Sequence, residues 1–171
     1  SITCVDSGGH FAQEVYEACR MRQSKRVFAI KGRSGDGVPY TAPPSKIPIR
    51  GNKRITCWLY VLGVDSGKTI VMSNLKVQEP GPKYCHFSRN PDAGYDSAYF
   101  TGLLSEKLEL SHTSRGDRWM WVKIPGHERN EPLDCRNYAL AGLRILNPDM
   151  GAAERRLRGQ GEKSGVGAWR P

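Results

Sequence analysis

The first thirty residues follow a strand, turn, helix and strand pattern, and no other feature of the sequence constrains the fold as strongly. Residues 2–5 are mostly β-branched, and this run ends at Asp6 and a Ser-Gly-Gly turn. Residues 10–22 carry apolar side chains near helical spacing, and residues 27–30 are continuously apolar. Buried strands that alternate with a helix are typical of a βαβ unit. We therefore predict an α/β fold.

Turn and cap signals place the remaining elements. The segment 31–54 is rich in Gly, Pro, Ser and basic side chains, so we expect a long loop without regular structure. Further expected elements are strands at 55–62 and 84–87, helices at 66–77 and 95–106, and a hairpin of 107–112 with 118–124. The clearest helix is expected at 130–146, because Asn130 is a good N-cap and Pro132 suits the first turn.

The 171 residues are enough for one domain with a core, which we place at residues 1–148. The tail at 149–171 is basic and Gly-rich, and we expect it to be disordered. Five irregularly spaced cysteines without a C-x-x-C pair favour reduced core thiols over a zinc site or disulfides. We expect neither a signal peptide nor a membrane-spanning helix. Because the sequence opens inside a strand, we expect a fragment of a longer protein.

The basic residues concentrate in one segment. The whole chain has a net charge of +9, and the segment from Arg20 to Arg54 holds ten Lys and Arg residues against one acid, Asp36. Such a segment favours a polyanion such as nucleic acid. A solvated basic face is an equally good interpretation of the charge alone.

Asp6 is the first candidate for chemistry. It ends a predicted strand and precedes a glycine turn and a helix. Ligands of open α/β sheets bind beyond the carboxyl ends of the strands, and a carboxylate there suits Mg²⁺. The structural alternative is that Asp6 caps the helix that follows.

A second pair of acids opens the predicted helix 130–146. Glu131 and Asp134 are three residues apart, so they share one helix face. Asp134 would then project over the sheet end where Asp6 lies. Converging carboxylates are what two-metal phosphodiester hydrolysis needs. The alternative is that both acids only complement the helix dipole, and Glu131 fits this better than Asp134.

The segment 63–69, Gly-Val-Asp-Ser-Gly-Lys-Thr, is similar to a phosphate-binding loop. It is one residue short of the required spacing, since position 62 is Leu, so we expect no nucleotide binding here. Lys68 would still be available to a phosphate. Asp65 is either a helix cap or an additional acid near the metals.

Several segments together resemble the lambda-type terminase large subunit, in the order in which that family has them. They are Val5-Asp6-Ser7-Gly8-Gly9-His10, Val27-Phe28-Ala29-Ile30-Lys31-Gly32, Leu62-Gly63-Val64-Asp65 with Lys68, and Arg129-Asn130-Glu131-Pro132-Leu133-Asp134-Cys135. The resemblance covers residues 2 to about 148. It implies a partial ribonuclease H-like nuclease fold, a mixed sheet flanked by helices, N-terminally truncated so that an upstream acid-bearing strand and an ATPase are missing.

The resemblance also implies an activity and its partners. Members cut concatemeric phage DNA with divalent metal in the host bacterial cytoplasm, together with a small terminase subunit and the procapsid portal. We accordingly expect a Mg²⁺- or Mn²⁺-dependent endodeoxyribonuclease acting on double-stranded DNA. The alternative is a fragment that binds DNA or assists assembly without catalysis.

The resemblance carries over to particular residues. It makes Asp6 and Asp134 the catalytic residues and metal ligands, with Glu131 or Asp65 as the alternative third ligand. We expect the basic residues to contact DNA phosphates; they are Lys31, Arg33, Lys46, Arg50, Lys53, Arg54 and Lys68.

Overall fold

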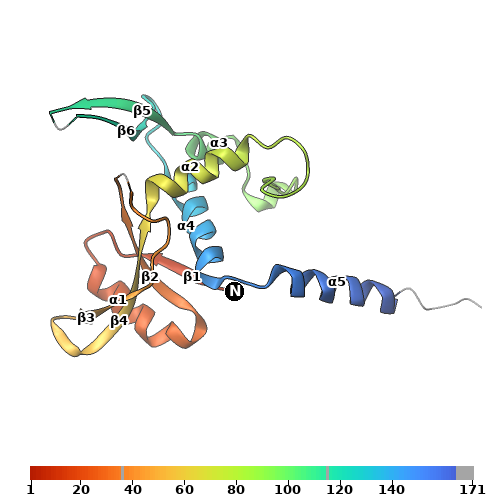
Figure 1. Cartoon of the computed structure of the whole chain (residues 1–171), viewed down its shortest axis with the longest axis horizontal. Coiled ribbons are helices and arrows are strands. Elements are labelled where there is room, and N and C mark those ends of the chain that lie inside the picture. Colours follow the sequence, from red (N-terminus) through yellow and green to blue (C-terminus); the bar gives the residue numbers. More distant parts are fainter. Residues whose placement is uncertain (36, 115, 165–171) are drawn as a thin grey trace, which may run out of the picture.

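The computed structural model describes residues 1–35, 37–114 and 116–164. Its main sheet has four strands in the order β1-β2-β4-β3 (Figure 1). The strands are β1 (Thr3–Asp6), β2 (Val27–Arg33), β4 (Asn52–Gly63) and β3 (Ser45–Ile49). β1, β2 and β4 are parallel, and β3 pairs antiparallel with β4 at one edge. The predicted βαβ unit and the mixed sheet are confirmed.

Helices cover both faces of this sheet. Side chains alternate between the two faces along each strand, so the apolar strand residues leave an apolar surface on both faces for helices to bury. Helix α1 (Ala12–Arg22), with the short η1 (Gln23–Lys25), connects β1 to β2 and buries Tyr16 and Cys19 against Ala29 of β2. Helix α4 (Glu131–Leu146) packs Ala141 against Ile30, the neighbour of Ala29 on the other face. The core is therefore two apolar layers with the sheet between them.

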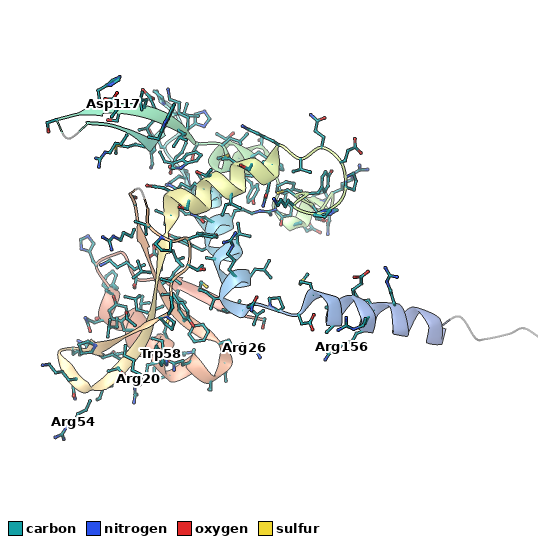
Figure 2. The ribbon with its side chains drawn as sticks, viewed as in Figure 1. Arg20, Arg26, Arg54, Trp58, Asp117 and Arg156 are labelled. Carbon is teal, nitrogen blue, oxygen red and sulfur yellow. The ribbon has the colours of Figure 1, made fainter. Side chains whose placement is uncertain are left out.

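A second group of elements lies beyond the carboxyl ends of the parallel strands (Figure 1). Helix α2 (Val64–Leu75) continues directly from β4, and η2 (Pro91–Ala93) and α3 (Ser97–Leu103) follow. Val71, Leu103 and Leu133 form a third apolar cluster here. The hairpin of β5 (Glu106–Thr113) and β6 (Gly116–Lys123) is a separate two-stranded sheet. It carries Asp117 far from Trp58 of the main sheet (Figure 2).

The structure corrects the expected loop at 31–54. β2 continues to Arg33, β3 occupies Ser45–Ile49, and β4 begins at Asn52. The prolines of this segment favour a loop, but β3 is an edge strand, where a missing N–H is tolerated. The register of β3 also shifts between Pro48 and Ile49.

Two other expectations fail because tertiary packing decides them. Residues 84–87 form no strand; Phe87 instead packs edge-to-face on Tyr99 and Phe100. The helix expected at 95–106 spans only Ser97–Leu103, where Asp96 accepts a hydrogen bond from the Tyr99 N–H at 2.8 Å. The hairpin and the helix at 130–146 are confirmed within a few residues.

The tail differs locally from the expectation of disorder. Residues 150–164 form helix α5 (Met150–Ser164), which extends away from the sheet (Figure 1). Its Leu157 is 71% exposed, so the helix lacks the apolar burial that stabilises most helices. Residues 165–171 lie outside the described residues, and the division into a domain and a tail stays a prediction. In the described part of the chain, no helix combines the length and apolar character that crossing a bilayer requires.

The contact between α2 and α4 depends on a glycine. A Cβ at Gly67 would collide with the side-chain oxygen of Asn137 and the ring of Tyr40. Asn137 is fully buried and donates to the Val64 carbonyl oxygen at 3.1 Å. We expect Gly67→Ala to lower the free energy of unfolding by about 1–3 kcal/mol through overpacking. Gly9→Ala is the matched control, because no atom lies within 4 Å of a Cβ there. Urea denaturation of both variants would show the difference, and equal stabilities would contradict the packing described.

Candidate active site

Asp6 is held at the carboxyl end of β1 by the turn that follows it. The Gly8 N–H donates to Asp6 Oδ1 at 2.8 Å. The hydroxyl of Ser7, which is buried, donates to the Ile30 carbonyl oxygen of β2 at 2.8 Å and anchors the turn. The N-cap position of α1 is Phe11, without a side-chain cap. The helix-capping alternative for Asp6 is therefore wrong, and its carboxylate is exposed at the sheet edge.

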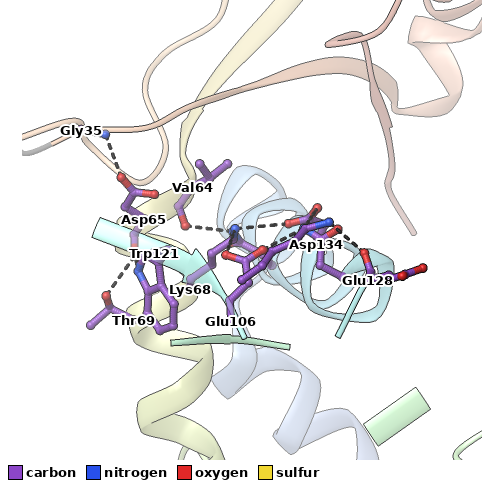
Figure 3. Close-up of polar contacts among 12 residues, drawn as sticks. Gly35, Val64, Asp65, Lys68, Thr69, Glu106, Trp121, Glu128 and Asp134 are labelled. Atoms are coloured by element: carbon purple, nitrogen blue, oxygen red, sulfur yellow. Dashed lines mark hydrogen bonds and ion pairs between the residues drawn. The ribbon is translucent and has the colours of Figure 1, made fainter. Parts of the chain in front are cut away.

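Asp134 lies in the first turn of α4, within a network of polar side chains (Figure 3). Its Oδ1 is 3.7 Å from Lys68 Nζ, and its Oδ2 accepts from Asn130 Nδ2 at 3.1 Å. Lys68 Nζ also donates to Glu106 Oε2 at 2.7 Å, and Asn130 Nδ2 donates to Glu106 Oε1 at 2.8 Å. One lysine and one asparagine therefore connect two carboxylates from different elements.

Tyr138 joins this network to Asp6. It lies one helical turn after Asp134 on α4, and its hydroxyl donates to Asp6 Oδ2 at 3.4 Å. Burial raises the pKa of Tyr138, and the charges of Asp6 and Asp134 raise it further. Both carboxylates thus act on the same phenol. Asp6 and Asp134 therefore lie within electrostatic range of one another, on either side of Tyr138 in the network, while their roles as catalytic residues stay a prediction.

Burial also raises the pKa of Asp134, against the lowering effect of the Lys68 charge. The charges of Glu106 and Asp6 add to the rise. The ionised form of Asp134 is therefore less favoured than that of an ordinary aspartate. A further positive charge near Asp6 and Asp134 would relieve this repulsion.

The two alternative third ligands are engaged elsewhere. Glu131 is exposed and lies 3.4 Å from Arg129 Nε. Asp65 Oδ2 accepts from the Gly35 N–H at 2.8 Å, and the Asp65 carbonyl oxygen accepts from Trp121 Nε1 at 3.2 Å (Figure 3). Asp65 therefore fastens the loop after β2 and the hairpin to the start of α2.

Glu106 is a site residue that the sequence does not reveal, as are Asn130 and Tyr138. The sequence pattern places Glu106 at the end of a helix, but the helix ends at Leu103 and Glu106 opens β5. Its side chain is only 5% exposed. The sole signal is an acid at the start of an alternating strand, which is common on exposed hairpins.

The basic residues predicted to contact DNA do not form one continuous track. Lys68 is buried beneath the carboxylates. Arg50 is bound to Glu17 at 2.5 Å, and Lys46 lies over the Trp58 ring. Of the others, Lys31 and Arg33 are exposed at the carboxyl end of β2. Lys53 and Arg54 are exposed at the amino end of β4, at the opposite end of the sheet. DNA contact by any of them stays a prediction.

The donor set fits a divalent cation only in part. Within the described residues, no group of three or more His, Cys, Asp and Glu side chains could hold a metal ion. Mg²⁺, however, is commonly held by one or two carboxylates together with waters and substrate phosphates. The pair Asp6 and Asp134 fits that mode, with phosphate completing the site.

The fold and this cluster define an α/β domain with a carboxylate site at the carboxyl ends of its parallel strands. The family model described as "Terminase large subunit gpA, endonuclease domain" matches residues 1–156, and the chain belongs to this family. It is 32% identical over 156 residues to the terminase large subunit of Escherichia phage lambda, covering 85% of this chain and 22% of that protein. It is 29% identical over 150 residues to the terminase large subunit of Enterobacteria phage P21, with the same coverage.

The chain thus spans about a fifth of the length of these relatives, at 22% of each. A comparison with solved structures finds no significant match.

Proposed function

We propose that this chain is the metal-dependent endonuclease part of a terminase large subunit, and that it cuts concatemeric phage DNA by two-metal phosphodiester hydrolysis. The family match supports DNA cleavage as the activity. The observation that carries the proposal is the meeting of Asp6 and Asp134 around Tyr138. The mixed sheet, with an acid on a strand end and another on a flanking helix, supports a ribonuclease H-like fold.

Asp6 and Asp134 would hold Mg²⁺ or Mn²⁺. Bound divalent cations activate water and stabilise the leaving oxygen of the cleaved phosphodiester. The repulsion that raises the pKa of Asp134 supports this role, because a site that concentrates negative charge gains most from a cation. Two hydrogen bonds orient Asp6: the Tyr138 hydroxyl donates to Oδ2 and the Gly8 N–H donates to Oδ1.

Lys68 of α2 and Glu106 of β5 hold the side chain of Asp134 in position. Their ion pair is 2.7 Å long, and both side chains are nearly buried, at 11% and 5% exposure. With Asn130 they fix the first turn of α4 relative to α2 and β5. Lys68 therefore holds a metal ligand in place, and we assign it no contact with a nucleotide.

Double-stranded DNA would approach over the carboxyl ends of β2 and β4. Lys31 and Arg33 are exposed there and would contact phosphates, since such contacts position a duplex without reading its sequence. Membership of the family supports a small terminase subunit and a procapsid portal as partners, in the cytoplasm of the bacterial host.

The test is cleavage of supercoiled plasmid with Mn²⁺ by the 171-residue chain. We expect Asp6→Asn to lower the cleavage rate on the order of a hundredfold or more, since a metal supplies several kcal/mol of transition-state stabilisation. Asp92→Asn makes the same change at an exposed site outside the cluster and should retain activity. Cleavage that survives Asp6→Asn, or that resists a chelator, would refute the proposal.

A second candidate is a module that binds DNA or assists assembly without cutting it. The ion pair between Lys68 and Asp134 favours it, because a cation of the protein itself already lies beside that carboxylate. This candidate predicts salt-dependent DNA binding without metal-dependent cleavage.

A further inference from the structure

Six exposed basic residues gather at the amino ends of the parallel strands, away from the carboxylates. We call this set the basic end surface: Arg20, Arg22, Lys25, Arg26, Lys53 and Arg54. Helix α1 runs back between two parallel strands, so its last turn lies beside the start of β2. Lys53 and Arg54 belong to the start of β4. Arg20, Arg26 and Arg54 lie along the lower edge of the molecule in Figure 2.

The parts of this surface are close together in space. Arg20 lies beside Asn52 and Ile55 of β4, where all three line one hollow of about 500 Å³. Burial raises the pKa of the Cys57 thiol in β4, and the charge of Arg20 opposes that rise. Arg20 in the last turn of α1 thus lies beside the start of β4, next to the positions of Lys53 and Arg54 in sequence.

These six cations have no acidic partner within the part of the chain that the structure describes. None of the six takes part in an ion pair that the structure shows. The segments 18–26 and 51–56 contain no Asp or Glu. The neighbouring acids Glu14 and Glu17 both lie against Arg50, at 3.5 and 2.5 Å. Cations at this density raise the local concentration of polyanions.

We propose that the basic end surface binds the phosphate backbone of duplex DNA at a position separate from the cleavage site. This inference rests on the proposed function only for its choice of polyanion. Four of the six residues are arginines, whose planar guanidinium matches phosphate geometry. The hollow beside Arg20 also exposes Met21 and Ile55, which would suit an acidic amphipathic protein segment. The charged residues extend well beyond that hollow, so phosphate fits the surface better.

The strand register gives the distance, measured along the strands, between the basic end surface and Asp6. Asp6 pairs with Ile30, and Ile30 pairs with Tyr60, so Tyr60 marks the level of Asp6 on β4. The chain from Lys53 to Tyr60 then spans about 23 Å at the usual rise of a strand. That is roughly seven base pairs of duplex. For a duplex whose axis follows the strands, the surface would hold DNA within one helical turn of the scissile phosphate, without touching the reacting atoms.

The test compares how tightly two charge-matched triple variants bind a duplex of about 30 base pairs, which is several times the expected footprint. Binding is measured by fluorescence anisotropy, without metal and over a range of salt concentrations. The first variant, Lys25→Gln/Lys53→Gln/Arg54→Gln, removes half of the surface. The control, Lys76→Gln/Arg89→Gln/Arg156→Gln, removes the same charge from exposed residues elsewhere. Losing up to three phosphate contacts should reduce the slope of log K against log salt by about 2–3 and weaken binding roughly tenfold or more near 0.1 M salt. All replaced residues are exposed, so melting temperatures should stay unchanged.

Equal binding by the two triple variants would overturn the proposal, and would leave an acidic protein segment as the ligand of the hollow. The outcome is separable from the nuclease proposal. DNA binding that depends on the basic end surface, without cleavage by any form, would support the surface and refute the nuclease. Cleavage that needs Asp6, with DNA binding unaffected by the first variant, would support the nuclease and refute the surface.

Discussion

Asp134→Asn is expected to lower metal-dependent cleavage on the order of a hundredfold or more while leaving the fold at least as stable as the wild type. The carboxylate is a proposed metal ligand, and a metal contributes several kcal/mol to the transition state of phosphodiester hydrolysis. Asp117→Asn, at an exposed position in the hairpin, is the matched control. Loss of activity in both variants, or in neither, would count against the assignment.

The stability of the wild type has a pH dependence of definite sign that comes from Asp134. Burial, Glu106 and Asp6 raise the pKa of Asp134 above its unfolded value. Within the window between those two pKa values the folded state binds more protons, so stability falls as pH rises. Above that window the ionised Asp134 destabilises the fold. Urea denaturation across this range should show that the Asn variant lacks this contribution. A wild-type stability that rises where the variant's does not would contradict the direction of the shift.

Lys68→Met is expected to produce the largest loss of stability among single changes at the site. It would leave the nearly buried Glu106 carboxylate without its cation, 2.7 Å away in the wild type. Breaking a buried pair by removing one partner costs about 3–5 kcal/mol. For a chain of this size that is roughly 6–20 °C in Tm. Differential scanning calorimetry measures the effect directly.

A matched surface pair and a double variant make this prediction specific. Lys107 lies 2.9 Å from Glu109, but both side chains are 54% exposed, so Lys107→Met should cost at most about 1 kcal/mol. Adding Glu106→Gln to Lys68→Met should restore much of the loss, because an uncharged amide needs no cation. If Lys68→Met were no worse than Lys107→Met, Lys68 would not position Asp134 in the way proposed.

Local sequence patterns are sufficient to predict the strand that carries Asp6 and the helix that carries Asp134. Asp6 follows a β-branched run and Asp134 opens a well-signalled helix, and both features depend on residues close in sequence. The topology of a βαβ unit then places a strand end and a flanking helix on the same side. Sequence patterns and topology therefore predict that the two acids lie near the same end of the sheet, and the family resemblance is what singles them out from other acids.

Long-range contacts account for what the sequence does not reveal. Glu106 becomes part of the site because the hairpin starts beside α2, and no periodicity encodes that contact. Asp65 resembles a metal ligand in sequence, yet its carboxylate binds the Gly35 N–H. Pro48 suggests a loop, although an edge strand accepts proline. For Glu106 and Asp65 the partner lies far along the chain, where local signals carry no information.

A high count of basic residues in one segment of the sequence does not mean that these residues form one surface. The sequence places ten cations between Arg20 and Arg54, but the fold separates them. Lys31 and Arg33 lie at the carboxyl end of the sheet, and the basic end surface lies at the other end. One stretch of sequence therefore supplies two separate basic regions at opposite ends of the sheet, and DNA contact by each is a proposal.

Mn²⁺ binding followed by electron paramagnetic resonance tests most directly whether Asp6 and Asp134 bind the same cations, because it needs no turnover. We expect the chain to remove free Mn²⁺ from solution when a short duplex supplies phosphate, and each of Asp6→Asn and Asp134→Asn to weaken that binding. The double variant should bind more weakly than either single variant, but its loss should be smaller than the sum of the two single losses in free energy, since both residues serve one site. Unchanged Mn²⁺ binding in the double variant would contradict the assignment of Asp6 and Asp134 as metal ligands.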